Sequence, residues 1–284
     1  SIIKALTVNS DSEIMVVAPF FPEYRVFIEN ASGRVVVAPT REPEFQPDIE
    51  ALAAAISPRC AAVIVNSPNN PSGAVYTEES LRALTSLLRR KSYEYGKTIY
   101  LISDEPYREL VYDGATVPYV PSLYDDTIVC YSYSKSLSLP GERIGYVMVS
   151  PRTRGCDAIC DAVAGAARRA GYVCAPSFMQ RVLTETLGIY SDLSVYDENR
   201  RVLLEALTSY GYTVTPPHGA FYLFVKSPEP DAHAFSERAK KYGLLLVPSD
   251  SFGVPGYVRL AYCKRTEEVL RSLPRFRELM ESYR

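Results

Sequence analysis

A lysine surrounded by hydroxyl side chains follows a short apolar segment near the middle of the chain. The segment reads Ser132-Tyr-Ser-Lys135, and Arg143 lies a little further on. Polar residues just beyond the carboxyl end of a strand lie where α/β sheets bind ligands. Desolvation and neighbouring cations lower a lysine's pKa, as Schiff-base chemistry requires. Ser132, Ser134 and Arg143 suit a phosphate, which Arg binds bidentately. The pattern favours a reactive lysine beside a phosphate site, although alone it also fits a polar loop with a solvated lysine.

An acidic residue follows another apolar run, in the segment Ser103-Asp104-Glu-Pro-Tyr107. A carboxylate at this position would pair with a protonated pyridine nitrogen and increase its electron withdrawal. Tyr107 could reach an oxygen on the same ring. The more common role of an aspartate at such a junction is to cap the next helix, so both interpretations stay open.

A third polar segment, Asn66-Ser-Pro-Asn69-Asn70-Pro71-Ser-Gly73, also follows an apolar run. Asn, Pro and Gly are typical turn residues. A rigid turn with two prolines could also aim an amide at a ligand, and Asn70 is the candidate.

The apolar runs themselves predict the sheet that positions these residues. They are continuous rather than alternating, which is typical of parallel strands covered on both faces. Helical patterns lie between them, the clearest over 77–91, with Thr77 as its cap and Arg89 to Lys91 near its carboxyl end. This alternation predicts an α/β domain with a mostly parallel sheet sandwiched by helices. The predicted strands are 14–18, 35–38, 62–66, 99–102, 128–131 and 145–149.

The second half of the chain changes character. Helical patterns occupy 155–190 and 195–210, and strands are expected at 220–225, 244–247 and 257–261 before a last helix over 266–282. This order predicts a smaller α+β domain. We place the boundary near residue 192, which gives a large domain over 1–191 and a small one over 192–284.

Composition excludes several classes of protein. The 284 residues carry a formal net charge of −2, which gives no electrostatic case for a nucleic-acid partner. No apolar run reaches the roughly 18 residues that suggest a membrane span. Six cysteines without a CxxC pair favour buried, reduced thiols of a cytoplasmic protein. Two histidines leave little for a metal centre, and we expect no metal.

Together the motifs NNPSG, DEPY, SYSKS and GERIG resemble the class I/II family of fold-type-I aminotransferases, over residues 14–262. That resemblance implies pyridoxal 5'-phosphate as cofactor. It also implies ping-pong transfer of an amino group between an L-amino acid and a 2-oxo acid. The expected substrates, on family base rates, are amino acids such as aspartate or alanine.

The resemblance also implies roles for individual residues. Lys135 would form the internal aldimine and shuttle the proton, and Asp104 would hold the pyridinium proton. Tyr107 and Asn70 would hydrogen-bond the phenolic oxygen. The other implied residues bind cofactor or substrate: Ser132, Ser134 and Arg143 at the phosphate, Phe21 stacked on the ring, Arg259 at the substrate carboxylate, and Gly219 in a turn facing the site. An arginine within an apolar strand is costly to bury without an anion, which supports Arg259 independently.

The family's glycine-rich phosphate-binding turn and N-terminal arm do not precede Ser1-Ile-Ile-Lys-Ala-Leu6, so we interpret the chain as lacking its N-terminal segment. A homodimer is implied by the family. Arg168 and Arg169 lie near the place of a second substrate-binding arginine, although a solvated basic pair on a helix is the more common situation.

Two other functions remain. The same residues would serve a carbon–sulfur lyase acting by β-elimination. In a different class, an aminotransferase-like domain could act as the sensor of a transcription regulator, but it would need less of the substrate machinery than is found here.

Overall fold

The computed structural model describes residues 1–283, and its central feature is a six-stranded sheet. The strand order is β2-β1-β5-β6-β7-β8, with five parallel strands and an antiparallel β8 at one edge. The mostly parallel α/β sheet is therefore confirmed. Its strands are β1 (Glu13–Val17), β2 (Arg34–Ala38), β5 (Cys60–Asn66), β6 (Tyr100–Asp104), β7 (Thr127–Ser132) and β8 (Gly145–Val149).

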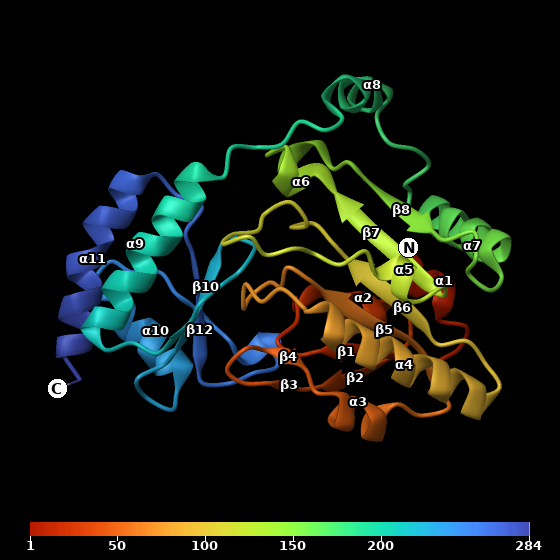
Figure 1. Cartoon of the computed structure of the whole chain (residues 1–284), viewed down its shortest axis with the longest axis horizontal. Coiled ribbons are helices and arrows are strands. Elements are labelled where there is room, and N and C mark those ends of the chain that lie inside the picture. Colours follow the sequence, from red (N-terminus) through yellow and green to blue (C-terminus); the bar gives the residue numbers. More distant parts are fainter. Residues whose placement is uncertain (284) are drawn as a thin grey trace.

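Helices cover both faces of this sheet (Figure 1). Successive side chains of a strand point to opposite faces of the sheet. Every residue of β1 is buried, so both faces are covered at this strand. Ile14 and Val16 pack with one set of helices, and Met15 and Val17 pack with the other. The first set is α1 (Ile2–Leu6), α2 (Glu23–Asn30) and α7 (Cys156–Arg169); the second is α3 (Ile49–Ala55), α4 (Glu78–Tyr95) and α5 (Val120–Leu123).

Helix α4 has the predicted beginning and a later end. The Thr77 hydroxyl accepts a hydrogen bond from the Ser80 amide at 3.1 Å. The helix continues beyond 91 to Tyr95 and ends at Gly96, whose φ of 62° lies in the left-handed region that terminates helices. Arg89 to Lys91 therefore do not lie in its last turn, and that part of the prediction is wrong.

The second half of the chain forms a four-stranded antiparallel sheet, ordered β11-β12-β10-β9. Its strands are β9 (Val214–Thr215), β10 (Tyr222–Lys226), β11 (Val247–Pro248) and β12 (Tyr257–Ala261). Helices α9 (Ser194–Tyr210) and α11 (Thr266–Glu281) lie side by side against it, and α10 (Ala232–Lys240) follows β10 (Figure 1).

The strand expected over 244–247 is largely wrong, and α10 was not predicted. Leu244 and Leu246 are buried in the core without pairing, and only Val247 and Pro248 join the sheet. A short apolar run has the same periodicity in a strand as in a buried loop, so its pattern could not separate them.

The segment after β6 connects the two sheets. Tyr107, Leu110 and Tyr112 belong to the same hydrophobic cluster as residues of α9, β10 and α11. The carboxyl end of β6 is therefore held close to β10. The boundary near residue 192 stays a prediction.

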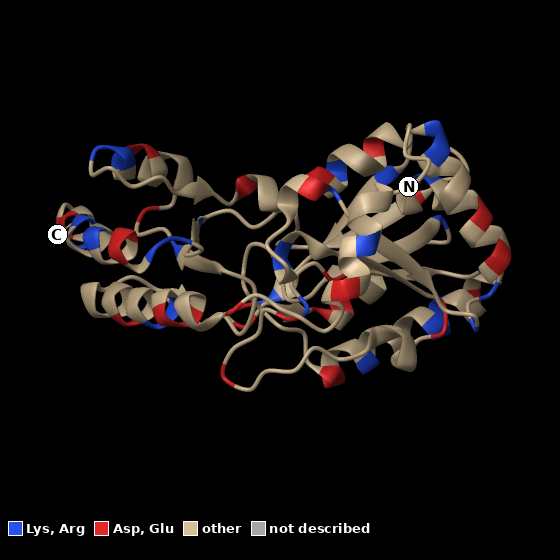
Figure 2. Ribbon diagram, turned by 90° about the horizontal axis from the view of Figure 1, so that it is seen from above, with Lys and Arg blue, Asp and Glu red and all other residues tan. Residues whose placement is uncertain are grey.

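Short elements complete the fold. Two-residue strands β3 (Thr40–Arg41) and β4 (Gln46–Pro47) pair with each other, and the remaining helices are α6 (Tyr133–Ser136), α8 (Ser177–Thr186), η1 (Pro140–Glu142) and η2 (Asp250–Phe252). None of the described helices is long and apolar enough to cross a membrane. Basic and acidic residues are interspersed along the helices (Figure 2).

The cysteines are free, but the expectation that they are buried is mostly wrong. Cys60 is buried, whereas Cys160 and Cys174 are exposed. Cys160 lies on α7 and Cys174 in the loop after it, which are largely solvent-facing parts of the chain.

Candidate active site

Three neighbouring strands end in polar residues at the same edge of the large sheet. Asn66 ends β5, Asp104 ends β6 and Ser132 ends β7. Asn66 and Asp104 are register partners, and the Asn66 side-chain amide donates to the Asp104 carbonyl at 3.0 Å. The edge that binds ligands in α/β folds therefore carries an amide, a carboxyl group and a hydroxyl in a row.

The Asp104 carboxyl group lies beside a cavity of about 690 Å³ that Phe21 and Tyr24 also line. The Tyr24 hydroxyl donates a hydrogen bond to Asp104 Oδ2. The pKa of Asp104 is raised to about 6, mainly by burial; the bond from Tyr24 opposes the rise and the charge of Glu105 adds to it. A carboxyl group with this pKa can hold or share a proton near neutral pH. Phe21 meets Tyr24 edge to face, with ring centroids 5.7 Å apart.

Lys135 lies in α6, the single helical turn that directly follows β7. Its Nζ atom is 5.3 Å from the centroid of the Phe221 ring and 6.0 Å from that of Tyr107. Phe221 directly precedes β10 of the second sheet, whereas Tyr107 follows β6 of the large sheet, so the amine faces one ring from each half of the chain. The structure thus brings Lys135 and Tyr107 together from separate motifs.

Tyr107 is buried, and its hydroxyl lies 3.1 Å from the hydroxyl of Tyr222. Burial is the main cause that raises the pKa of Tyr107, and the neighbouring Tyr222 raises it further. Tyr107 is therefore a neutral hydrogen-bonding group at any physiological pH.

Arg259 lies on β12 and reaches the Asn70 turn. Its guanidinium donates to Asn70 Oδ1 at 2.9 Å and lies 4.7 Å from the Tyr222 ring centroid and 5.1 Å from that of Phe252. Within residues 1–283 no carboxylate forms an ion pair with it. By contrast, the buried Arg200 is paired with both Asp113 and Asp197. A partly buried arginine between aromatic rings, without a carboxylate of its own chain, is suited to bind an external anion.

The Asn70 turn is held rigidly against the second sheet. The Asn70 amide donates to Asn66 Oδ1 at 2.8 Å, and the amide of Gly219 donates to the Gly73 carbonyl at 3.0 Å. A Cβ on Gly219 would lie 2.6 Å from the Pro68 Cβ. Gly219 therefore permits a close backbone approach, which places the 217–219 turn against the one that carries Asn70.

The residues predicted to bind a phosphate are brought together only in part. The Ser132 hydroxyl caps α6, accepts from the Ser134 amide at 3.2 Å and lies 2.7 Å from the Ser134 hydroxyl. Arg143 is exposed, has a left-handed backbone with φ of 53°, and donates to the Pro140 carbonyl at 2.9 Å. In this arrangement its guanidinium makes no hydrogen bond to either serine.

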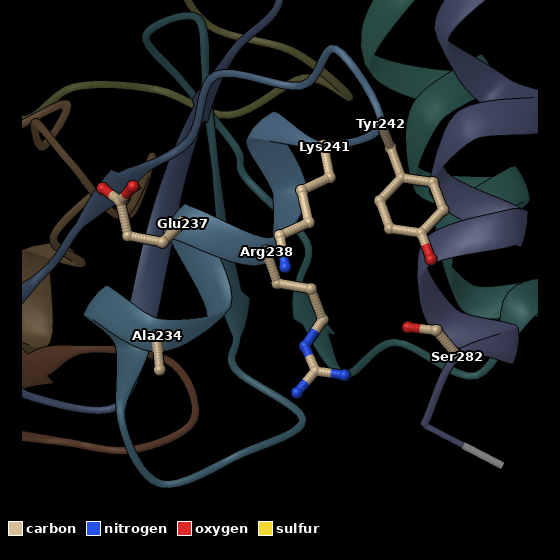
Figure 3. Close-up of a pocket in the computed structure, with 6 residues that line it drawn as sticks. All are labelled: Ala234, Glu237, Arg238, Lys241, Tyr242 and Ser282. Carbon is tan, nitrogen blue, oxygen red and sulfur yellow. The ribbon is translucent and has the colours of Figure 1, made fainter.

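Arg168 and Arg169 lie in the last turn of α7 and are exposed. Arg169 lines the same 690 Å³ cavity as Asp104. A further cavity, of about 400 Å³, lies between α10 and the end of α11 (Figure 3). None of the predicted site residues lines it, and its Arg238 is already held over the ring of Tyr283 at 4.4 Å.

Sequence reasoning missed three residues of this arrangement: Tyr24, Asn66 and Tyr222. Tyr24 lies three residues after Phe21, and Tyr222 lies three residues after Gly219. Each of the three acts through a side-chain contact with another segment, which no local pattern encodes. Only the polar end of an apolar run at Asn66 was a usable signal.

Comparison with known proteins defines the class. The family model "Aminotransferase class I and II" matches residues 1–275, and the chain belongs to this family. It is an enzyme that transfers amino groups, and members of this family depend on pyridoxal phosphate.

Individual relatives support the same class. A crystal structure of an aminotransferase from Eubacterium rectale superposes with a TM-score of 0.97 at 49% identity, covering 99% of this chain and 71% of that one. A probable aspartate/prephenate aminotransferase of Thermus aquaticus is 32% identical over 95% of this chain and 70% of its own length. An aspartate aminotransferase of Thermotoga maritima is 30% identical over the same shares. These relatives favour transamination over the lyase and the sensor domain.

Proposed function

We propose that the amino transfer takes place at the edge of the large sheet that carries Asn66, Asp104 and Ser132, with Lys135 as the reactive amine. An L-amino acid and a 2-oxo acid would be the two substrates. The observation that carries this proposal is the set of chemically different groups at one place: a proton-sharing carboxyl group, an amine among aromatic rings, and an arginine to which no carboxylate of residues 1–283 is paired.

The residues present fit pyridoxal phosphate. The Asp104 carboxyl group, with its pKa near 6, lines a cavity together with an aromatic side chain, as a protonated pyridine ring requires. When bound, the cofactor supplies the electron sink that lets an amino acid lose its α-proton. Asp104 would hold the proton of the ring nitrogen, and Phe21 would stack on the ring.

The remaining residues bind, orient or move protons. Lys135 Nζ would hold the cofactor covalently at rest and carry the α-proton during transfer. Tyr107 and Asn70 would orient the phenolic oxygen, and Arg259 would bind the substrate α-carboxylate bidentately. Ser132, Ser134 and Arg143 would bind the phosphate, with the Arg143 side chain turning away from the Pro140 carbonyl. Gly219 would keep the substrate-facing turn in place.

A spectroscopic experiment tests the assignment of Lys135. The purified protein, mixed with pyridoxal phosphate, should develop a yellow absorbance band that borohydride fixes covalently. Lys135→Ala should lose the band. Lys91→Ala is a matched control, because Lys91 lies on α4 and its amine is held by Glu94 and the Tyr95 hydroxyl. A band of equal strength in Lys135→Ala would contradict the proposal.

A donor screen then identifies the reaction. Single amino acids, aspartate and alanine first, are added to the yellow protein, and a donor should convert the band and release its 2-oxo acid. A second 2-oxo acid should restore the band. Pyruvate and ammonia released without an acceptor would identify a lyase instead. If no amino acid converts the band, the proposed activity is wrong.

We also propose that the protein works as a cytoplasmic homodimer. Family resemblance supports the dimer, and the free cysteines suit a reducing compartment. Exposed apolar side chains around α8, among them Phe178, Leu187 and Ile189, offer a surface for a second copy. Light scattering of the purified protein tests the oligomeric state, and a monomer at micromolar concentration would contradict it.

A further inference from the structure

Tyr222 touches two of the groups named above, yet the proposed function gives it no role. It begins β10, opposite Ala261 of β12, and it is buried. Its hydroxyl lies 3.1 Å from the hydroxyl of Tyr107. Its ring contacts Arg259, whose guanidinium lies 4.7 Å from the ring centroid of Tyr222. Tyr222 thus links Tyr107 and Arg259 by direct contact with both.

The hydroxyl of Tyr222 differs from those of other tyrosines in the same cluster. The hydroxyls of Tyr112 and Tyr262 donate to the Ala220 carbonyl, at 2.7 and 3.3 Å, and Tyr212 donates to the Phe276 carbonyl. Those bonds satisfy the buried phenols with backbone groups, and the hydroxyls of Tyr112 and Tyr262 also bond to each other, away from the groups that the proposed function uses. Tyr222 instead meets a side chain that the proposed function places at the cofactor.

In the pair of hydroxyls on Tyr107 and Tyr222, the protonation states determine which group donates and which accepts. Burial raises the pKa of both Tyr107 and Tyr222, so both phenols are neutral at physiological pH. Each hydroxyl has one proton to donate and can also accept. When Tyr107 donates its proton to another acceptor, its oxygen can still accept the proton of Tyr222. The bond from Tyr222 would then fix the direction of the Tyr107 hydroxyl and strengthen it as a donor.

The position of Arg259 explains why a phenol ring suits this place. The guanidinium lies near two aromatic rings, those of Tyr222 and Phe252, while Asn70 Oδ1 accepts one of its five N–H groups. Phenylalanine at 222 would keep this ring contact and lose only the hydroxyl. The substitution Tyr222→Phe therefore separates the contribution of the hydroxyl from that of the ring.

We propose that Tyr222 is a positioning residue: its hydroxyl orients the Tyr107 hydroxyl toward the cofactor, and its ring supports the Arg259 guanidinium that binds the substrate carboxylate. This inference rests on the proposed roles of Lys135, Tyr107 and Arg259. It makes the first residue of β10 a part of the site and not only of the hydrophobic core.

The test compares Tyr222→Phe, Tyr107→Phe and the double variant, each loaded with pyridoxal phosphate. The first readout is the pH titration of the Lys135-dependent absorbance band. Tyr222→Phe should shift the apparent pKa of the band in the same direction as Tyr107→Phe and by less. In the Tyr107→Phe background, Tyr222→Phe should add no further shift, because it acts through Tyr107.

The second readout is the affinity for propionate, a carboxylate without an amino group, measured by its effect on the same band. Tyr222→Phe should retain the wild-type affinity within about two-fold, since the ring contact with Arg259 remains. Tyr262→Phe is the matched control: it removes a hydroxyl from the same cluster that donates to a backbone carbonyl, and it should leave the band titration unchanged.

Two results would overturn the inference. One is a Tyr222→Phe titration identical to that of the wild type, and the other is a shift of equal size in the presence and absence of the Tyr107 hydroxyl. In both cases the wild-type protein still shows its Lys135-dependent band, so the proposed function is not contradicted. Absence of any Lys135-dependent band in the wild type would overturn the proposed function, and the role of Tyr222 with it.

Discussion

Asp104 shows how burial can tune a single carboxyl group for this chemistry. Its ordinary pKa of 3.8 rises to about 6, mainly because burial disfavours the charged form. The bond from Tyr24 opposes this rise and keeps the ionised form accessible near neutral pH. In the cofactor-free protein an ionised Asp104 is therefore a cost to the folded state.

That cost gives a prediction about Asp104→Asn in the cofactor-free protein. Because the folded-state pKa is raised, the stabilisation from protonating Asp104 is full below pH 4 and is lost as the pH rises through 6. Between pH 5 and pH 8 the wild type should lose about 1 kcal/mol of unfolding free energy that the variant keeps. Urea unfolding at the two pH values measures the difference. A constant gap between variant and wild type would show that Asp104 does not titrate in this range.

At the scale of elements, two turns locked together position Asn70. Gly73 has a φ of 71°, and a Cβ there would lie 2.3 Å from the Pro217 Cβ. The 217–219 turn leads into β10, which begins with Tyr222. Strand β10 pairs with β12, which carries Arg259. The contact between the two turns thus sets the distance between the Asn70 amide and the guanidinium that it binds.

We predict that Gly73→Ala is more damaging than Gly96→Ala. Both glycines have a positive φ, at 71° and 62°, so both substitutions introduce similar backbone strain. Only at Gly73 does the new methyl group collide with a neighbour, since nothing lies within 4 Å of a Cβ at Gly96. The extra cost at Gly73 should be about 1–3 kcal/mol, measured by chemical denaturation. Equal losses for the two variants would mean that the 217–219 turn yields easily.

At the scale of the whole molecule, Arg200 of α9 ties the second half of the chain to the segment that follows β6. Its side chain is 3% exposed and binds Asp113 through both terminal nitrogens, at 2.8 and 2.9 Å. It also binds Asp197 and lies 4.8 Å from the ring centroid of Tyr112. Tyr107 is in the same segment as Tyr112, so this tie helps to hold the site together.

The neighbouring arginine offers a direct comparison. Arg200→Met should lower the free energy of unfolding by about 2 kcal/mol, because Asp113 and Asp197 lose a buried partner. Arg201→Met should cost about 0–1 kcal/mol, because Arg201 is 68% exposed and only approaches Asp197, at 3.4 Å. Urea denaturation curves of the two variants check this. Similar stabilities would show that the buried tie adds little to the fold.

The sequence alone determined the class of fold and the groups that act locally. Continuous apolar runs identified the strands of the large sheet. For inner strands such as β1 and β5 the reason is burial on both faces, whereas the edge strands β2 and β8 are partly exposed. Asp104, Lys135 and the Asn70 turn lie shortly after such runs, so their common edge could be predicted from chain order. Arg259 was identifiable because an arginine in an apolar strand needs an anion.

Only the tertiary structure decided which side chains meet. Tyr24 and Asp104 are 80 residues apart in the chain, Tyr107 and Tyr222 are 115 apart, and Asn70 and Arg259 are 189 apart. Local patterns report the surroundings of a residue along the chain, and these pairs form across two sheets. The raised pKa of Asp104 and the buried hydroxyl pair of Tyr107 and Tyr222 depend on desolvation by distant segments, which exists only once the chain has folded.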